Sequence, residues 1–409
     1  MTTPWKTDKY FVSPLNYLPE VTKDYHLPAK IKIHDITLRD GEQETGIALQ
    51  KDEKVAIAEA LAEAGVHRIE AGMPAVSKQD ENAIREIVKR NLGPEIFAFC
   101  RCILDDVRLA ADCGVSGVIV EIPSSEHIIE YGYQWTLSKA IQASVDATRL
   151  AHELGLYTVF FTIDATRADF NKLFQIIEAV AADGHMDSLT LVDTMGVCAP
   201  PAIRHYVRTM RARLQRPLEA HFHNDFGLAN ANSLAAVEEG AEVVHSTVLG
   251  MGERAGQAST EQLALALELM YGIKTGIKLD RLYHLTQVVQ KLTGHVTPLN
   301  QPVAGADMYK LESGIPANWW LRCKDQHPTE VFPVLPSLIG QGDVEVVLGK
   351  GSGTDSVAYW LGRIGQPVPA LDQLLDLTMQ VKEISMQKHG LLTEAEFRGL
   401  VERFQAERA

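Results

Sequence analysis

Short apolar runs alternate with longer stretches of helical periodicity from about residue 30 onward. The runs are rich in Val, Ile, Leu and Phe, which is typical of buried parallel strands, and the stretches between them repeat apolar residues at helical spacing. Eight strands are predicted, at 31–34, 68–71, 96–99, 118–121, 158–162, 189–192, 218–221 and 243–247. Amphipathic helices are predicted between them, for example at 51–64 and 137–154. This alternation predicts an α/β protein built on a TIM (β/α)8 barrel.

The chain is longer than such a barrel requires. A barrel takes about 250 residues, and the sequence has 409. We therefore predict an N-terminal extension at 1–29, a catalytic barrel at 30–275, and a C-terminal linker with a small, mostly helical subdomain at 276–409. Helical patterns at 370–388 and 393–407 belong to that last region.

Composition and charge exclude several classes of partner. Lys and Arg number 39 against 53 Asp and Glu, which gives a formal net charge of -14 at pH 7. Such a charge repels phosphate backbones and anionic lipid, so we expect no nucleic acid partner. No stretch approaches the ~18 apolar residues of a membrane span, and the start lacks the pattern of a signal peptide. We expect a cytoplasmic protein without membrane contact, whose five scattered cysteines form neither a disulfide framework nor a zinc site.

Candidate chemistry is concentrated where the predicted strands end, because those ends converge on one mouth of a barrel. His221 and His223 alternate by two on the seventh strand, so both imidazoles point to the same side. Asp40 follows the first strand, which neighbours the eighth around a closed barrel. Two neutral imidazoles and one carboxylate can hold a divalent metal ion and leave coordination positions open for a substrate. Mg, Mn and Zn all remain admissible.

Two motifs resemble a known family. Leu38-Arg-Asp-Gly-Glu-Gln43 with Lys54 downstream, and Leu218-Glu-Ala-His-Phe-His-Asn-Asp-Phe-Gly-Leu-Ala229, resemble the two signatures of the isopropylmalate and homocitrate synthases. These enzymes belong to the metal-dependent DRE-TIM superfamily, which also contains hydroxymethylglutaryl-CoA lyase. The resemblance spans the barrel and continues weakly into the tail, at 312–315 and 348–353. It implies that the metal chelates a 2-oxo acid, that an acyl-CoA carbanion attacks the keto carbon, and that the thioester is then hydrolysed.

The resemblance also implies roles for individual residues. Arg39 occupies the position of an arginine that neutralises the developing alkoxide, and Thr194 that of a residue bonded to the carboxylate of the 2-oxo acid. Gln43 stands where condensing members of the superfamily carry glutamine, which favours synthesis over cleavage. His127 matches a histidine that faces the substrate side chain, and Gln257 replaces the asparagine that usually completes the metal site.

Three further substrate-binding candidates follow from position at the mouth, namely Glu70, Arg101 and Arg167. Surplus positive donors on Arg101, Arg167 and His127 favour a dicarboxylic 2-oxo acid, although oxaloacetate, 2-oxoglutarate, pyruvate and 2-oxoisovalerate all remain open. Other positions depart from the family pattern. Ile163 stands where a glutamate involved in activating the acyl donor is usual, and Pro316 replaces an expected histidine of the tail. Tyr309, Glu312 and His295 are candidate substitutes, with Tyr309 and Glu312 taken as catalytic.

The leading hypothesis is a metal-dependent acyltransferase that condenses an acyl-CoA, most simply acetyl-CoA, with a 2-oxo acid to a 2-alkylmalate, homocitrate or citrate-like product. Ile163 and Pro316 keep open a carbon-carbon lyase or aldolase similar to hydroxymethylglutaryl-CoA lyase. A non-catalytic relative that serves as a sensor or subunit is the third alternative. Apolar aromatic segments at 319–320 and 357–361 predict a homodimer or higher homo-oligomer in which tail residues reach the partner's active site.

Overall fold

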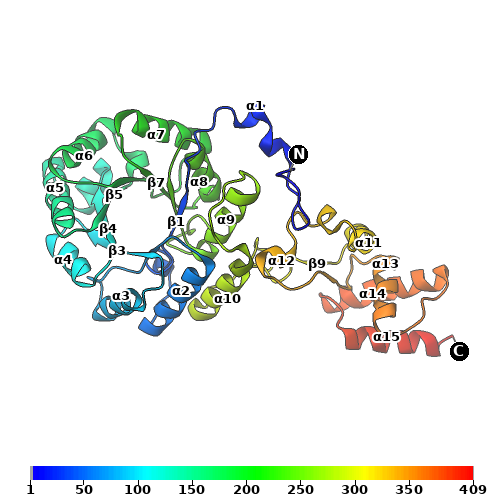
Figure 1. The fold of residues 1–409 in the computed structure, drawn as a ribbon. Helices are drawn as coiled ribbons and strands as arrows, with labels where there is room; N and C mark the ends of the chain where they lie inside the picture. Colours follow the sequence, from blue (N-terminus) through cyan, green and yellow to red (C-terminus); the bar gives the residue numbers. More distant parts are fainter. Residues whose placement is uncertain (1–2, 409) are drawn as a thin grey trace. The chain divides into compact units, whose positions relative to one another are not determined.

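The computed structural model describes residues 3–408. By contact the chain separates into two compact units, and Figure 1 shows the elements of both. The barrel unit comprises Pro14–Thr297, and the tail unit comprises the described residues 3–13 and 298–408. The boundaries suggested by the sequence at residues 30 and 275 both lie inside the barrel unit, and they stay a proposal for where the catalytic part begins and ends.

The barrel unit contains a closed barrel of eight parallel strands in sequential order (Figure 1). Its strands are β1 (Lys32–Asp35), β2 (Arg68–Glu70), β3 (Glu95–Arg101), β4 (Gly117–Pro123), β5 (Tyr157–Ile163), β6 (Ser188–Asp193), β7 (Leu218–Phe222) and β8 (Val243–Ser246). Every strand predicted from the sequence is present, with ends that differ by no more than two residues. Strand β1 pairs with both β2 and β8, which closes the cylinder. The predicted TIM barrel is confirmed.

Helices enclose the strands, as Figure 1 shows. They are α2 (Lys51–Ala64), α3 (Lys78–Arg90), α4 (Leu104–Asp112), α5 (Leu137–Glu153), α6 (Phe170–Asp183), α7 (Pro200–Arg213), α8 (Ala229–Glu238) and α9 (Thr260–Leu269), with α1 (Pro19–Thr22) before the barrel and α10 (Leu282–Thr293) after it. Helix α2 begins at a capping box formed by Gln50 and Glu53 and ends at Gly65 in the left-handed conformation. Within residues 3–408, none of the helices has the length and apolar character needed to cross a membrane.

The tail unit has its own hydrophobic core. Its elements are β9 (Lys310–Leu311), α11 (Gly314–Cys323), α12 (Pro336–Ile339), β10 (Glu345–Val346), α13 (Thr354–Arg363), α14 (Leu371–Lys388) and α15 (Glu394–Ala406). The mostly helical character expected of this region is confirmed. Val357, Trp360 and Leu361 of α13 are buried in the core of this unit, against side chains of α14 and α15. The prediction that the segment 357–361 is exposed on its own unit and available for a subunit interface is therefore wrong. Trp319, in the other aromatic segment, is 51% exposed.

Candidate active site

Asp40, His221 and His223 come together at the C-terminal mouth of the barrel. Each offers a ligand atom, and these atoms all lie within 4.8 Å of one another. His221 Nε2 is 3.6 Å from Asp40 Oδ2. All three side chains are buried, with exposures of 1–5%. The predicted metal ligands thus form one compact, water-poor cluster.

Local backbone geometry explains how Asp40, in the loop after β1, comes to lie beside His221 and His223 at the end of β7. His221 lies on β7, and His223 follows its last residue, so the two side chains share one face. After β1 the chain turns tightly, because the carbonyl oxygen of Ile36 accepts hydrogen bonds from the amides of Arg39, Asp40 and Gly41. This turn brings the Asp40 carboxylate back over the mouth.

Burial keeps both imidazoles in the form that binds metals. Burial lowers the pKa of His221 well below its ordinary value, and the neighbouring His223 and His245 lower it further. Burial also lowers the pKa of His223, against an opposing effect of Asp40. Both rings are therefore neutral at physiological pH, with a lone pair available for coordination.

Unpartnered polar atoms support the fit of a divalent cation here. Buried polar atoms in folded proteins almost always have a hydrogen-bond partner. In this site Asp40 Oδ1, His223 Nδ1 and both amide atoms of Gln257 are buried without one. Gln257 lies beside His223, to which it is joined by an antiparallel backbone bridge. One carboxylate, two neutral imidazoles and an amide oxygen are a suitable donor set for Mg, Mn or Zn, so the residues fit the metal that the motifs imply.

The loop that carries Gln257 depends on a glycine. Gly256 has φ +76°, and a Cβ at this position would collide with the carbonyl oxygen of Gly250. The amides of Gly250 and Gly256 donate to Thr247 and Glu253 within the same region. These glycines therefore serve the tight folding of the loop, which sets Gln257 next to β7.

Arg39 lies directly beside the metal ligands. Its Nη1 donates to Asp40 Oδ2 at 2.6 Å, its Nε donates to Glu70, and Gln43 Oε1 is 3.5 Å from Nη1. Burial alone would lower the pKa of Arg39, but the carboxylates of Asp40 and Glu70 raise it. The guanidinium thus stays charged, and its Nη2 is buried without a partner. This nitrogen is available for an anionic oxygen.

The Lys54 side chain anchors the loop between β1 and α2. Its buried ammonium contacts Glu42 and Asp80 at 2.5 Å each and donates to the carbonyl oxygen of Leu38 at 3.4 Å. A cavity of about 310 Å³ opens next to this loop. Its lining is Leu38, Arg39, Glu42, Gln43, Ile47, Ala48, Lys54, Gly72, Met73, Val76, Asp80 and Phe99. Lys54 thereby positions the segment that carries Arg39, Asp40 and Gln43.

Two of the expected substrate-binding cations are paired with carboxylates. Arg101 forms a two-pronged pair with Asp106, at 2.8 and 3.0 Å. Arg167 pairs in the same manner with Asp164, at 2.7 and 2.9 Å. This pairing argues against surplus positive charge on these two residues as a reason to favour a dicarboxylic substrate.

The other predicted site residues differ in their placement. Thr194 Oγ1 accepts a hydrogen bond from the Asp164 amide at 2.7 Å and keeps its own O–H to donate. His127 is exposed at a π-helical turn, and His295 pairs with Glu44 at 2.9 Å. Tyr309 and Glu312 belong to the tail unit. There the Tyr309 hydroxyl donates to the carbonyl oxygen of Val334, and Glu312 accepts from the Gly351 amide. Their catalytic role stays a proposal.

Three buried residues of the barrel were not singled out by sequence reasoning. Glu121 lies on β4 on the same face as Ile119, and burial raises its pKa to about 7. His245 of β8 and Glu219 of β7 lie inside the barrel below the metal ligands, both fully buried. A signal was present, since each is a polar residue at an inward strand position, where barrels usually carry branched aliphatic side chains.

The sequence is similar to one protein family and to several curated proteins over most of its length. The family described as HMGL-like matches residues 30–289. A putative (R)-citramalate synthase of Archaeoglobus fulgidus is 38% identical over 374 residues, which are 91% of this chain and 75% of that protein. A probable 2-isopropylmalate synthase of Ignicoccus hospitalis is 38% identical over 385 residues, 94% of each chain. Homocitrate synthase AksA of Methanothermobacter thermautotrophicus is 36% identical over 375 residues, 92% of this chain and 93% of that one.

Solved structures show the same fold. HMG-CoA lyase of Bacillus subtilis superimposes with a TM-score of 0.60 at 22% identity, over 66% of this chain and 96% of that one. The three relatives above carry names of different synthases at almost equal identity. Sequence similarity therefore does not identify the 2-oxo acid, which has to be inferred from the residues of the site.

Proposed function

This chain belongs to the HMGL-like family, and on that premise we propose that it condenses an acyl-CoA with a 2-oxo acid of apolar side chain, at a divalent ion held by Asp40, His221 and His223. The observation that carries the proposal is the cluster of these three buried ligands with the unpartnered Arg39 Nη2 beside it. The relatives' names, citramalate, isopropylmalate and homocitrate synthase, support condensation as the direction.

Each part of the mouth has a task in such a reaction. The bound ion would supply Lewis-acid polarisation of the keto group. Arg39, held by Asp40 and Glu70, directs its free Nη2 to the oxygen on which negative charge develops, and a preorganised donor of this kind needs no rearrangement as the charge forms. Thr194 offers its hydroxyl to the carboxylate of the 2-oxo acid. Burial of the ligands excludes water from the reacting carbanion.

Glu121 is the proton acceptor in this proposal. Ile119, two residues earlier on β4, packs with Phe99 and Phe161 inside the barrel, so Glu121 projects to the same interior at the mouth. Its charge interacts with that of Arg39, and burial raises its pKa to about 7. A carboxylate with such a pKa takes up a proton efficiently at physiological pH. Glu121 thus supplies the basic group that is missing at Ile163.

The cavity beside Arg39 supports an apolar substrate side chain. Ile47, Ala48, Met73, Val76 and Phe99 contribute its apolar wall. Among the described residues that line it, the cationic groups are Arg39 and Lys54, and both are paired with carboxylates. A second substrate carboxylate would have to be desolvated here without a cation of its own, which is costly.

Steady-state kinetics with acetyl-CoA test this proposal. We expect kcat/KM to be at least ~100-fold higher for pyruvate or 2-oxoisovalerate than for oxaloacetate or 2-oxoglutarate, because an unpaired buried carboxylate costs several kcal/mol. Met73→Arg should narrow that gap by adding a cation to the cavity wall, and Met73→Leu is the matched control. A preference of the native enzyme for the dicarboxylic acids would refute the substrate assignment. Cleavage of a hydroxy acid without any condensation would favour the lyase instead.

A further inference from the structure

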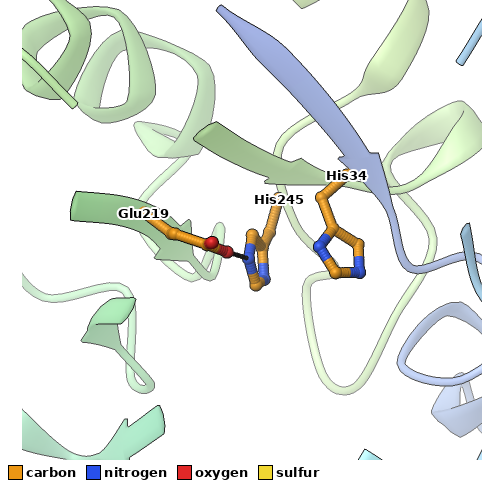
Figure 2. Close-up of side chains that lie close together, drawn as sticks. All are labelled: His34, Glu219 and His245. Atoms are coloured by element: carbon orange, nitrogen blue, oxygen red, sulfur yellow. Dashed lines mark hydrogen bonds and ion pairs between the residues drawn. The ribbon is translucent and has the colours of Figure 1, made fainter. Parts of the chain in front are cut away.

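The barrel interior beneath the metal ligands is polar. Barrels of this type are usually filled by Val, Ile and Leu. Here β1, β7 and β8 contribute His34, Glu219 and His245, all fully buried, and Figure 2 shows the three side chains together. Burying such groups costs free energy unless each is hydrogen-bonded, so their presence calls for a physical reason.

Glu219 is held as an anion. Its Oε1 accepts from Arg68 Nη1 at 2.8 Å and from Ser188 Oγ at 2.7 Å, and its Oε2 lies 2.7 Å from His245 Nε2. The guanidinium of Arg68 always carries its charge, and its salt bridge to Glu219 holds this carboxyl in the ionised form. A carboxylate can only accept hydrogen bonds. His245 Nε2 therefore carries a hydrogen and donates it to Glu219 (Figure 2).

The other nitrogen of His245 meets a metal ligand. His245 Nδ1 is 3.4 Å from His221 Nδ1. In a neutral imidazole one nitrogen donates and the other accepts, so His245 with its hydrogen on Nε2 accepts at Nδ1. The donor in this contact is then His221 Nδ1. This leaves His221 Nε2, the nitrogen that lies 3.6 Å from Asp40 Oδ2, with a free lone pair.

We propose that Glu219 and His245 are positioning residues that hold His221 in the Nδ1–H tautomer and thereby direct its Nε2 to the divalent ion. The inference rests on the metal site of the proposed function, although not on the reaction itself. A metal-ligating histidine usually donates its other ring N–H to a carboxylate or another acceptor, which fixes the ring and raises its affinity for the metal. In this chain a second imidazole extends that arrangement, and Arg68 anchors its far end.

A second metal ion at His34, Glu219 and His245 is the competing explanation, since their ligand atoms also lie within 4.8 Å of one another. The hydrogen bonds argue against it. Both oxygens of Glu219 are already occupied by donors, and one of these donors is the guanidinium of Arg68. In the cluster of Asp40, His221 and His223, by contrast, Asp40 keeps one carboxylate oxygen without a partner. We therefore expect one ion per chain.

His34 provides a matched control. Its ring centroid is 4.5 Å from that of His245, and its backbone pairs with His245 in the β1–β8 register. Both of its ring nitrogens lack a hydrogen-bond partner. His34→Phe and His245→Phe are thus the same substitution in the same buried layer, and only the second removes a hydrogen bond to His221.

Calorimetric titration of the metal-free protein with Mn²⁺ measures the effect without any substrate. We expect one site in the native protein, a loss of roughly 10–100-fold in affinity for His245→Phe, and less than about 3-fold for His34→Phe. Circular dichroism of each variant checks that it is folded. Equal losses in the two variants, or two ions bound per native chain, would overturn the proposal.

Histidine-selective ¹⁵N NMR of the metal-free native protein observes the tautomer itself. We expect His221 to carry its hydrogen on Nδ1 in the native protein and in His34→Phe. In His245→Phe, which lacks the acceptor for that hydrogen, we expect it on Nε2. An Nε2–H tautomer of His221 in the native protein would overturn the inference, even if His245→Phe failed to fold. Because no turnover is involved, failure here is distinguishable from failure of the proposed reaction.

Discussion

Glu121 gives a prediction that can be worked through from the structure. The residue lies on β4, where its backbone pairs with Arg101 and Phe161 of the neighbouring strands. Its side chain is 5% exposed, and the Tyr133 hydroxyl lies 3.4 Å from Oε1. Burial raises the pKa of this carboxyl to about 7, although Tyr133, Arg39 and Arg101 oppose the shift. Ionisation of Glu121 therefore destabilises the folded state.

The sign of the pH dependence follows from linkage. The folded pKa of about 7 lies above the ordinary value of 4.5, so the folded chain binds this proton more tightly than the unfolded chain does. The stabilising effect of the bound proton is complete below about pH 4.5 and is lost as pH rises to about 7. At ~1.4 kcal/mol for each pH unit of that interval, full ionisation costs about 3.5 kcal/mol.

Urea unfolding of the native chain and of Glu121→Gln, at about pH 5 and about pH 8, measures this cost. The variant cannot ionise, so its advantage over the native chain should be about 2.5 kcal/mol larger at the higher pH, since a small part of the cost is already present at the lower pH. Comparing the two pH values removes any constant effect of the amide on its contact with Tyr133. Glu130→Gln, which replaces an exposed carboxylate of the following turn, serves as control and should show no such change. A gap of equal size at both pH values would refute the reasoning.

Three further predictions concern the site and the assembly. Gln257→Ala should weaken Mn²⁺ binding roughly tenfold in a calorimetric titration, because the buried amide next to His223 is a ligand candidate, and unchanged affinity would remove it from the metal site. Gly256→Ala should destabilise the barrel unit by more than about 1 kcal/mol in thermal unfolding, because the new Cβ collides with the Gly250 carbonyl oxygen at positive φ; a neutral result would show that the loop can relax. Sedimentation at micromolar concentration should show a dimer or larger assembly, and a fully active monomer would contradict that prediction.

The barrel was predictable because its signal is local and repeated. Most strands contain a short apolar run, and the intervening helices carry an amphipathic period, so both the type and the order of elements could be derived. The His221 and His223 pair was predictable for the same reason, since alternation along a strand fixes which side chains share a face. Asp40 joined them because strand order in a closed barrel brings β1 next to β8.

The contacts of individual side chains and the packing of the tail helices could not be predicted from the sequence. Arg101 and Arg167 were interpreted as substrate ligands although carboxylates only a few residues away, Asp106 and Asp164, neutralise them. Glu219 and His245 became meaningful only when the register placed them within hydrogen-bond distance. In the tail, the apolar segment of α13 is covered by α14 and α15, and the sequence does not reveal how helices of one unit pack together.

The most direct test of the central claim is a balance of products with and without the metal ion. Metal-free enzyme is incubated with acetyl-CoA and 2-oxoisovalerate, Mn²⁺ is added to one half, and free CoA and the condensed acid are measured together. The account predicts equal amounts of CoA and a 2-alkylmalate in the Mn²⁺ sample alone, and neither product when His221→Ala replaces the native chain. Condensation that continues undiminished in the metal-free sample or in His221→Ala would contradict it.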